Sequence, residues 1–136
     1  MTVKTFKLEI ITPRKVVFTG DVTSFTAPGT VGYFQVLYDH APFISALAIG
    51  KVKLQDSNDK EIQYSTSGGF VEIKDNKVVM LTDSIESAAE IDVKRAESAK
   101  DRAQKRLAEK SVDVDVERAR AALARALNRL RIAQEH

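Results

Sequence analysis

The first 84 residues alternate between apolar and polar positions with a period of two. Phe6, Leu8 and Ile10 fall on one side of such a segment, and Lys7 and Glu9 fall on the other, a pattern typical of a half-buried β-strand. Similar segments recur without an intervening helical pattern at residues 3–11, 15–18, 22–27, 33–37, 43–49, 51–55, 61–66, 70–73 and 77–81. This spacing predicts an antiparallel β-sandwich of about nine or ten strands over residues 1–84.

Turn-forming residues separate these segments. Gly20-Asp21 and Pro28-Gly29 predict turns on either side of the third strand, because such residues favour the backbone angles of tight turns. The runs at residues 56–59 and 75–76 predict hairpin connections. Residues 85–90 follow neither the strand period nor the helix period, and they predict a short connector.

From Asp92 onward the sequence is helical in character and contains no Gly or Pro. Asp92 is a preferred N-cap, and the first predicted helix runs from it to about Lys110. Residues 111–115 interrupt the pattern, because β-branched residues and Asp favour non-helical and capping positions. Asp113 or Asp115 is placed to cap a second helix that continues almost to the C-terminus. Two helices joined by about five residues predict an antiparallel hairpin.

The apolar stripe of this hairpin consists mostly of alanine. Its members are Ala96, Ala99, Ala103 and Leu107 in the first helix and Val116, Ala119, Leu123, Ala126, Leu130 and Ala133 in the second. A buried methyl group contributes about 0.8 kcal/mol, against about 1.5–3 kcal/mol for a whole buried Leu or Val. Both helices also have high intrinsic propensity, so they can stay helical after separating. We therefore expect the hairpin domain, residues 85–136, to be a two-state element that can leave its partner surface.

Composition narrows the classes of function. The chain of 136 residues has no Cys and a net charge of +2, which excludes disulfides and cysteine-based metal sites and gives no indication of nucleic-acid binding. It has no apolar signal core and no stretch near the ~20 apolar residues of a membrane span, so we expect a soluble cytoplasmic protein. No P-loop or nucleophile motif is present, and His40 is expected to be a turn or packing residue. We expect no catalytic residue, no catalytic cofactor and no metal site.

The segment Ile91-Asp92-Val93-Lys94-Arg95-Ala96 is the first candidate for binding chemistry. Asp92 and Arg95 emerge on the same side of the first helical turn, within reach of each other. One interpretation is a capped helix with a local ion pair, favoured by the helix dipole. The other is an acid and a base that together hold a ligand. The spacing leaves both interpretations open.

The second predicted helix carries five arginines and no acidic residue between its first and last arginine. Arg125 and Arg129 stack on one face, where like charges cost helix stability. One interpretation is a solvated basic face, or salt bridges to Glu97, Asp101 or Glu109 of the first helix. The other is an anion held between the helices, since guanidinium groups suit phosphate oxygens. No aromatic residue lies there to stack on a base, so we expect no nucleic-acid partner.

Three segments resemble the epsilon subunits of bacterial F-type ATP synthase, and the resemblance covers the whole chain. They are Gly32-Tyr33-Phe34-Gln35-Val36-Leu37-Tyr38-Asp39-His40-Ala41-Pro42, Ser67-Gly68-Gly69-Phe70 and Ile91-Asp92-Val93-Lys94-Arg95-Ala96. The last matches the ATP-binding motif of that family, I/L-D-x-x-R-A, at every specified position. The resemblance implies ATP-binding roles for Glu86, Ile91, Asp92, Arg95, Ala96, Arg102, Arg125 and Arg129.

The same resemblance implies a regulatory, non-catalytic subunit of the proton-translocating synthase, peripheral to the cytoplasmic face of the cell membrane. The sandwich would contact the gamma subunit and the c-ring as part of the rotor. The helices would either fold as a hairpin or extend into the alpha/beta catalytic head and inhibit ATP hydrolysis. ATP, with or without Mg²⁺, would be a regulatory ligand that favours the folded hairpin. The alternative is a constitutive structural subunit of the central stalk that binds no nucleotide.

Overall fold

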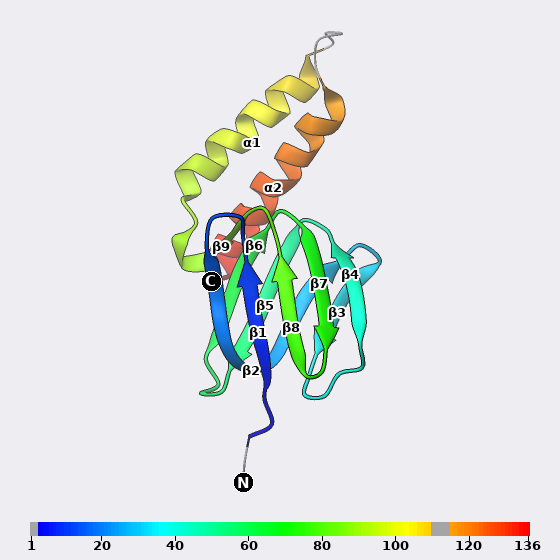
Figure 1. The fold of residues 1–136 in the computed structure, drawn as a ribbon. Helices are drawn as coiled ribbons and strands as arrows, with labels where there is room; N and C mark the ends of the chain where they lie inside the picture. The colour runs from blue at the N-terminus through cyan, green and yellow to red at the C-terminus, as the bar shows by residue number, and fades with distance from the viewer. Residues whose placement is uncertain (1–2, 110–114) are drawn as a thin grey trace.

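The computed structural model describes residues 3–109 and 115–136. In these residues nine strands precede a short 3-10 helix and two α-helices that run antiparallel to each other (Figure 1). The elements are β1 (Phe6–Ile11), β2 (Val16–Gly29), β3 (Gly32–Val36), β4 (Phe43–Leu47), β5 (Gly50–Asp56), β6 (Glu61–Thr66), β7 (Gly69–Lys74), β8 (Lys77–Leu81), β9 (Ile85–Ser87), η1 (Ala88–Glu90), α1 (Val93–Ala108) and α2 (Val116–Glu135). The predicted fold, a β-sandwich followed by a two-helix hairpin, is confirmed.

The strands form two layers that share β2. The order β1-β8-β7-β4 makes the layer nearer the viewer in Figure 1, and β2, β5, β6 and β9 continue the sheet behind it, with β3 paired to β2. The first half of β2 pairs with β1, and its second half pairs with β3 and β5. The pairs are antiparallel except β1 with β8, which run parallel.

The predicted turn at Gly20-Asp21 is wrong. Gly20 and Asp21 lie inside β2, opposite Leu8 and Lys7 of β1. The register of β2 against β5 shifts between Val22 and Ser24, close to the point where β2 changes partner. An irregularity of this kind bends a strand, and it allows the one long strand β2 to serve both layers.

The turn predicted at Pro28-Gly29 lies two residues later. Pro28 and Gly29 remain in β2, paired with Tyr33 and Gly32, and the turn is made by residues 30–31. Proline cannot donate to a strand ladder, but the Pro28 carbonyl accepts a hydrogen bond from Ala48 N–H at 2.8 Å. Proline is thus accommodated near the end of the strand through its acceptor alone.

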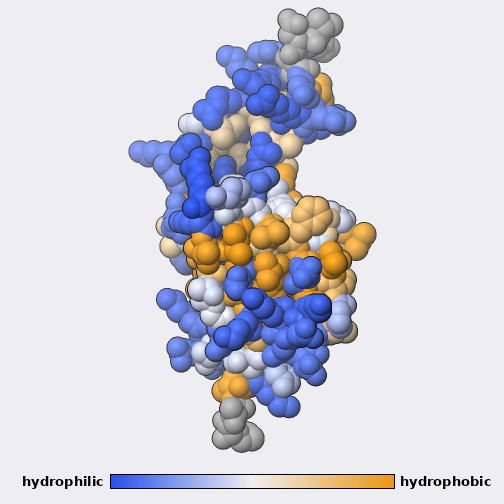
Figure 2. Space-filling model, in the orientation of Figure 1, coloured by the Kyte–Doolittle hydropathy of each residue, from blue (hydrophilic) through white to orange (hydrophobic). Residues whose placement is uncertain are grey.

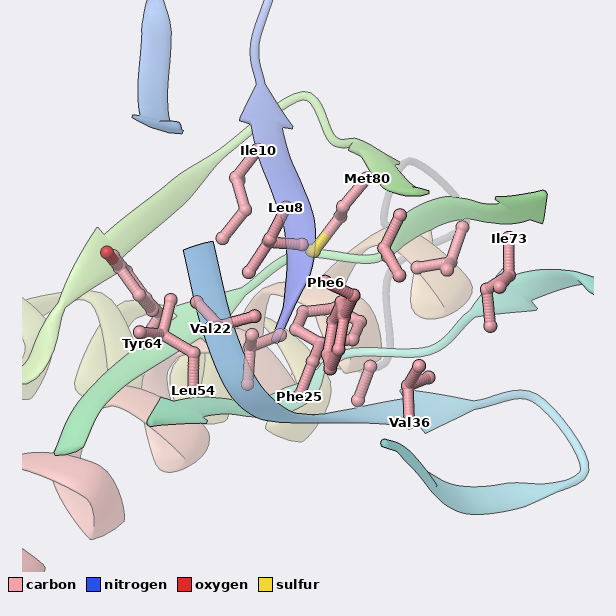
Figure 3. Close-up of a cluster of buried hydrophobic side chains, with 14 of the residues drawn as sticks. Phe6, Leu8, Ile10, Val22, Phe25, Val36, Leu54, Tyr64, Ile73 and Met80 are labelled. Atoms are coloured by element: carbon pink, nitrogen blue, oxygen red, sulfur yellow. The ribbon is translucent and has the colours of Figure 1, made fainter. Parts of the chain in front are cut away.

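The core lies between the two layers, where the alternating apolar side chains meet (Figure 3). Phe6, Leu8 and Ile10 are buried, as the period of two predicts, whereas Lys7 is exposed. Their main neighbours are Val22, Phe25, Val36, Val52, Leu54, Tyr64, Val71, Ile73, Val78 and Met80. This aromatic and branched core explains why the sandwich is a firm platform for the more weakly packed hairpin.

The hairpin rises from one end of the sandwich, and the C-terminal end of α2 returns to it (Figure 1). Ala96, Ala103, Ala119 and Ala126 are buried as predicted. Val116 was expected in the stripe but is 45% exposed, while Ile132, outside the stripe, is fully buried. Ile132 is buried because the last turns of α2 pack on η1 and the sheet rather than on α1, whereas nothing in the structure explains the exposure of Val116.

The second helix begins at one of its two predicted capping residues. Asp115 Oδ1 accepts from Arg118 N–H at 3.0 Å at the start of α2. The alternative cap, Asp113, lies outside the described residues. Residues 85–90, expected as a connector, form the edge strand β9, which pairs with β6, and the turn η1. No helix in the described part of the chain is long and apolar enough to cross a membrane.

Candidate functional site

The Ile91–Ala96 segment forms the N-terminal turn of α1. Asp92 is the N-cap, and its Oδ1 accepts from the backbone N–H of Arg95 at 3.1 Å. In the described structure, the Asp92 carboxylate and the Arg95 guanidinium do not form a salt bridge with each other. The predicted helix cap is therefore confirmed, whereas the predicted ion pair between the two side chains is wrong. The Arg95 guanidinium is not engaged by Asp92.

A polar cleft of about 260 Å³ opens at this turn. It is lined by Glu86, Glu90, Asp92, Arg95, Ala96 and Arg129. These residues come from β9, η1, the start of α1 and the C-terminal half of α2. Arg129 reaches the cleft from the far helix, so the sandwich and both helices contribute to its lining. We call it the base cleft.

The Glu86–Arg129 pair closes the base cleft across two elements. Glu86 Oε1 of β9 lies 2.5 Å from Arg129 Nε of α2. The contact is ionic rather than an aligned hydrogen bond, and Glu86 Oε1 is a buried atom that accepts no hydrogen bond. Each side chain remains about one-third exposed. The Glu86 carboxylate and the Arg129 guanidinium therefore form one wall of the base cleft.

Glu90 is a cleft residue that sequence reasoning missed. The Ser87 hydroxyl donates to Glu90 Oε1 at 2.6 Å, and this hydrogen bond lowers the pKa of Glu90 below its ordinary value. The negative charge of Glu90 and, to a greater degree, burial raise the pKa of the Tyr64 hydroxyl. The S-x-x-E spacing of Ser87 and Glu90 is the signal that could have identified the residue.

Ile91 lies beneath the cleft rather than in its wall. It is buried in a small apolar cluster with Ala88, Ile132 and Ala133. Its position in the motif is explained by packing, since this cluster joins η1 to the end of α2. Of the predicted residues, Glu86, Asp92, Arg95, Ala96 and Arg129 are thus brought together, and Ile91 supports them from below.

Arg102 and Arg125 line a second cleft of about 240 Å³ between the two helices, nearer the hairpin tip. Arg106 and Arg118, which were not predicted as site residues, share it, and alanines of both helices form its apolar walls. Within residues 3–109 and 115–136, none of these four arginines forms an ion pair. The predicted alternative, salt bridges to Glu97, Asp101 or Glu109, is therefore wrong for the described residues. We call this second cleft the arginine cleft.

The remaining candidate residues with described positions do not form a cleft comparable to these two. His40 Nδ1 lies 2.7 Å from the Ala41 carbonyl oxygen, and its ring lies beside Phe43, as expected of a turn and packing residue. Among the residues with described positions, no three His, Asp or Glu side chains are grouped to hold a metal ion.

The sequence matches two family models, which follow one another along the chain. Residues 5–88 match the β-sandwich domain of the ATP synthase delta/epsilon chain, and residues 89–134 match its long α-helix domain. The chain is 53% identical to the ATP synthase epsilon chain of Pelotomaculum thermopropionicum over 133 residues, 98% of each chain. It is 43% identical to that of Desulforamulus reducens over 96% of this chain and 98% of the relative.

The fold is also found in a known assembly. A chain in the cryo-EM structure of the Euglena gracilis mitochondrial ATP synthase, which contains OSCP, F1 and the c-ring, superposes with a TM-score of 0.83. The similarity covers 100% of the present chain and 84% of that chain, at 22% identity. At this identity the likeness extends to the fold, in which a sandwich and a two-helix domain again occur together.

Proposed function

Because the chain belongs to the ATP synthase epsilon-chain family, we propose that it is a non-catalytic regulatory subunit whose hairpin senses ATP. ATP binds the docked hairpin and keeps it folded against the sandwich. When ATP is scarce, the helices leave the sandwich, extend into the alpha/beta catalytic head and inhibit ATP hydrolysis. The subunit acts as part of the rotor, at the cytoplasmic face of the membrane that holds the synthase.

The single observation that carries this proposal is the order of charges along the hairpin. The base cleft combines the carboxylates Glu86, Glu90 and Asp92 with two guanidinium groups, whereas every charged side chain that lines the adjacent arginine cleft is cationic. A nucleotide has the complementary order, with donors on its adenine and ribose and anions at its phosphate end. Carboxylates accept from the amino and hydroxyl groups, while arginines bind phosphate oxygens.

The size of the two clefts supports a ligand that spans both. Each is smaller than the roughly 300–1,000 Å³ of ordinary small-molecule sites, but they follow one another along the same helix pair. Arg125 and Arg129 lie one turn apart on α2 and belong one to each cleft. A chain of phosphates that leaves the base cleft therefore meets Arg125 and Arg102 next. A longer phosphate chain gains more of these contacts, which favours ATP over ADP.

Ligand binding at this place favours docking by mass action. The base cleft needs Glu86 of the sandwich, Arg95 of α1 and Arg129 of α2 together, so the released hairpin has no equivalent site. For a site of about micromolar affinity and about millimolar ATP, the docked state gains about 4 kcal/mol. Helices held by an alanine seam are weakly enough packed for a term of this size to decide their position.

The sandwich supplies the rotor contact through an apolar row on its outer face. Ile11, Leu81, Phe70 and Ala46 are successive partners across β1, β8, β7 and β4, and Phe70 is 60% exposed. Figure 2 shows the apolar band on this side of the sandwich, below the polar hairpin. Exposed apolar surface of this kind marks a protein contact, and we assign it to the gamma subunit. The end of the sandwich opposite the hairpin then faces the c-ring.

The second candidate function is a constitutive structural subunit of the central stalk. It is favoured by one observation: the ionised groups of the base cleft other than Arg95 already have partners. Asp92 is occupied as a helix cap, and Glu86 and Arg129 compensate each other's charge. In this case the clefts bind no nucleotide, and the hairpin stays docked at every ATP concentration.

Calorimetric titration with ATP and ADP, each with and without Mg²⁺, separates the two functions. The proposal predicts micromolar-range ATP binding, weaker ADP binding, and loss of the ATP signal in Arg95→Ala. Arg125→Ala is expected to reduce ATP affinity more than ADP affinity, because its contact is with the phosphate end. Arg120→Ala is the matched control, since Arg120 is exposed on α2 and lines neither cleft. Absence of heat at millimolar ATP would establish the structural alternative.

A further inference from the structure

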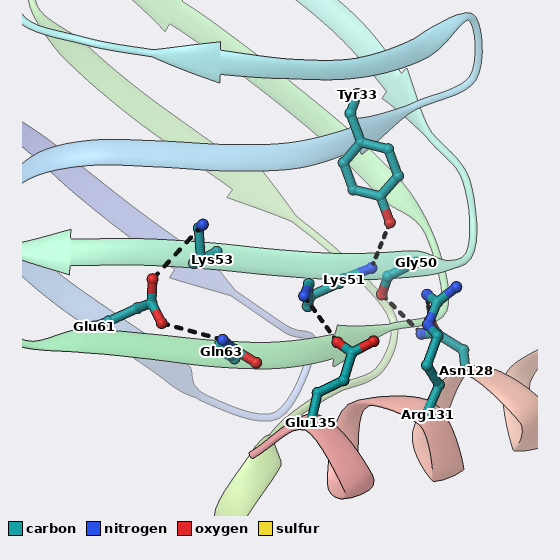
Figure 4. A network of polar contacts seen from close by, with 9 residues as sticks. All are labelled: Tyr33, Gly50, Lys51, Lys53, Glu61, Gln63, Asn128, Arg131 and Glu135. Atoms are coloured by element: carbon teal, nitrogen blue, oxygen red, sulfur yellow. Dashed lines mark hydrogen bonds and ion pairs between the residues drawn. The ribbon is translucent and has the colours of Figure 1, made fainter.

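A buried asparagine joins the hairpin to the sandwich outside the two clefts. Asn128 of α2 is only 6% exposed. Its Nδ2 donates to the Gly50 carbonyl at 2.8 Å and to Ser65 Oγ at 3.0 Å, and its Oδ1 accepts from Arg131 Nη2 at 2.6 Å. Figure 4 shows the amide reaching from the helix to the end of β5. A polar side chain buried at this depth is tolerated because its hydrogen bonds are made.

The carbonyl that receives Asn128 is held rigidly by the sandwich. A Cβ atom at Gly50 would lie 2.6 Å from Pro28 Cβ and 2.8 Å from Tyr33 Oη, so neighbouring strands pack directly on this residue. The next N–H, that of Lys51, donates to Tyr33 Oη at 3.0 Å. The acceptor is therefore held in place by the sandwich itself, and α2 must bring the amide into line with it for the hydrogen bond to form.

The other contacts of this end of α2 are less specific. Ile132 packs into the small apolar cluster around Ala88 and Ile91, which favours burial without requiring one register. The Lys51–Glu135 ion pair, at 3.0 Å, is partly exposed on both sides, and such pairs contribute little to stability. Neither contact distinguishes the observed placement of the helix from one shifted by a fraction of a turn.

We propose that Asn128 is a polar lock that fixes the docked position of the hairpin without any ligand. Buried polar residues on helices have this role in specifying register elsewhere, because a misplaced amide loses its partners. In the docked position all three hydrogen bonds form at once. In the released state the amide, Gly50 and Ser65 return to water. Asn128 is a positioning residue, and it does not itself contact a nucleotide in this proposal.

The lock is connected to the base cleft through adjacent residues on both sides. Asn128 and Arg129 are neighbours on α2, and their partners Ser65 and Glu86 are directly opposite each other in the β6–β9 pair. Residues opposite each other in such a pair lie side by side on one face of the sheet. When the Asn128 amide is hydrogen-bonded to Ser65, the Arg129 guanidinium is therefore also brought next to Glu86. In this way the lock assembles the wall of the base cleft to which β9 and α2 both contribute.

The test is the docked-to-released ratio of the hairpin in nucleotide-free protein. The chain has no cysteine, so Lys60→Cys and Ala124→Cys, both at exposed positions, allow one spin label on the sandwich and one on α2. Asn128→Ala is expected to raise the released fraction relative to the docked fraction about tenfold, through loss of the two hydrogen bonds to the sandwich. Alanine has the higher helix propensity, so a weaker α2 cannot cause this result.

Two further variants keep the test independent of general destabilisation. Asn128→Asp preserves the size of the side chain but places acceptors against the Gly50 carbonyl, and it is expected to release the hairpin at least as much as Asn128→Ala. Leu127→Ala, at the adjacent exposed position, is expected to leave the distance distribution unchanged. The lock is overturned if Asn128→Ala leaves the distribution unchanged, or if Leu127→Ala shifts it equally. Because no nucleotide is present, either outcome is separate from the fate of the ATP site.

Discussion

At the scale of single residues, Asp92 combines two roles that one substitution separates. As a cap it accepts from Arg95 N–H, and as a wall of the base cleft it offers a negative charge. Asn128 and Glu86 are similarly placed where the hairpin meets the sandwich. These positions show why the motif segment is informative: the same side chain begins the helix and faces the site.

The first prediction concerns Asp92→Asn and Asp92→Ala. Asparagine is as good an N-cap as aspartate, so Asp92→Asn is expected to retain helix stability but weaken ATP binding. Asp92→Ala is expected to lose both, with a cost to α1 of about 1 kcal/mol from the missing cap. Hydrogen exchange in the first turn of α1 and ATP titration are the two measurements. Equal ATP affinity in Asp92→Asn and the unchanged chain would show that only the cap matters.

The second prediction concerns acid. The hydrogen bond and the charge of Lys51 lower the pKa of Glu135 below its ordinary value near 4.5, and Arg131 acts in the same direction. A carboxyl group with a lowered pKa in the docked state stabilises docking above its ordinary pKa. This contribution is lost as the pH falls through the lowered value. Because the Lys51–Glu135 pair is partly exposed on both sides and contributes little, the labelled pair should report only a small rise in the released fraction, which begins as the pH falls below about 4.5.

The control for the acid prediction is Glu135→Gln. It removes the titrating group but keeps a side chain of similar size at the end of α2. The variant is expected to release the hairpin more readily at neutral pH and to lose this part of the pH dependence. An unchanged pH profile in Glu135→Gln would assign the acid response to other carboxylates.

Residue-level sequence reasoning found the motif but not the lock. Glu86, Arg95 and Arg129 were predicted because the chain resembles a family with a recognisable motif. Asn128 was missed because an asparagine between exposed and half-buried helical positions has the pattern of a surface residue. Its burial depends on packing against Gly50 at the start of β5, 78 positions away along the chain. No local pattern contains that information.

At the scale of elements, the hydrophobic period predicts which segments are strands and which are helices. Contacts with other elements decide where each strand or helix begins and ends. The residues around Gly20 read as two strands and a turn, yet they form one strand because β2 pairs with β1 and then with β5. The predicted stripe of α2 omits Ile132 for a related reason. One end of α2 packs on α1 and the other on the sheet, so its buried face changes along its length.

The third prediction tests the alanine seam. Ala126 is fully buried, and Ala126→Leu is expected to separate the helices, because overpacking a close contact costs about 1–3 kcal/mol. Helix content measured by circular dichroism should remain, since leucine is a good helix former. Ala124→Leu, at an exposed position on the same helix, is the control and should leave the docked hairpin intact. Retention of docking in Ala126→Leu would show that the seam tolerates larger side chains.

At the scale of the whole molecule, the chain combines a tightly packed sandwich with a more weakly packed helical hairpin. The sandwich has a continuous aromatic and aliphatic core, and the hairpin is held by alanines, one small apolar cluster and the Asn128 lock. In the proposed function, this inequality allows the hairpin to move while the sandwich stays folded. ATP bound at the junction of the two parts would then control the position of the hairpin rather than its folding.

The most direct test of ATP-controlled docking is the distance between the labels at positions 60 and 124 during an ATP titration. If ATP favours docking, the docked population rises over the concentration range in which calorimetry detects ATP binding, with a smaller response to ADP and none in Arg95→Ala. The Arg120→Ala control should respond like the unchanged chain. A distance distribution that stays constant up to millimolar ATP, in a protein that binds ATP, would contradict the proposed link between nucleotide and hairpin position.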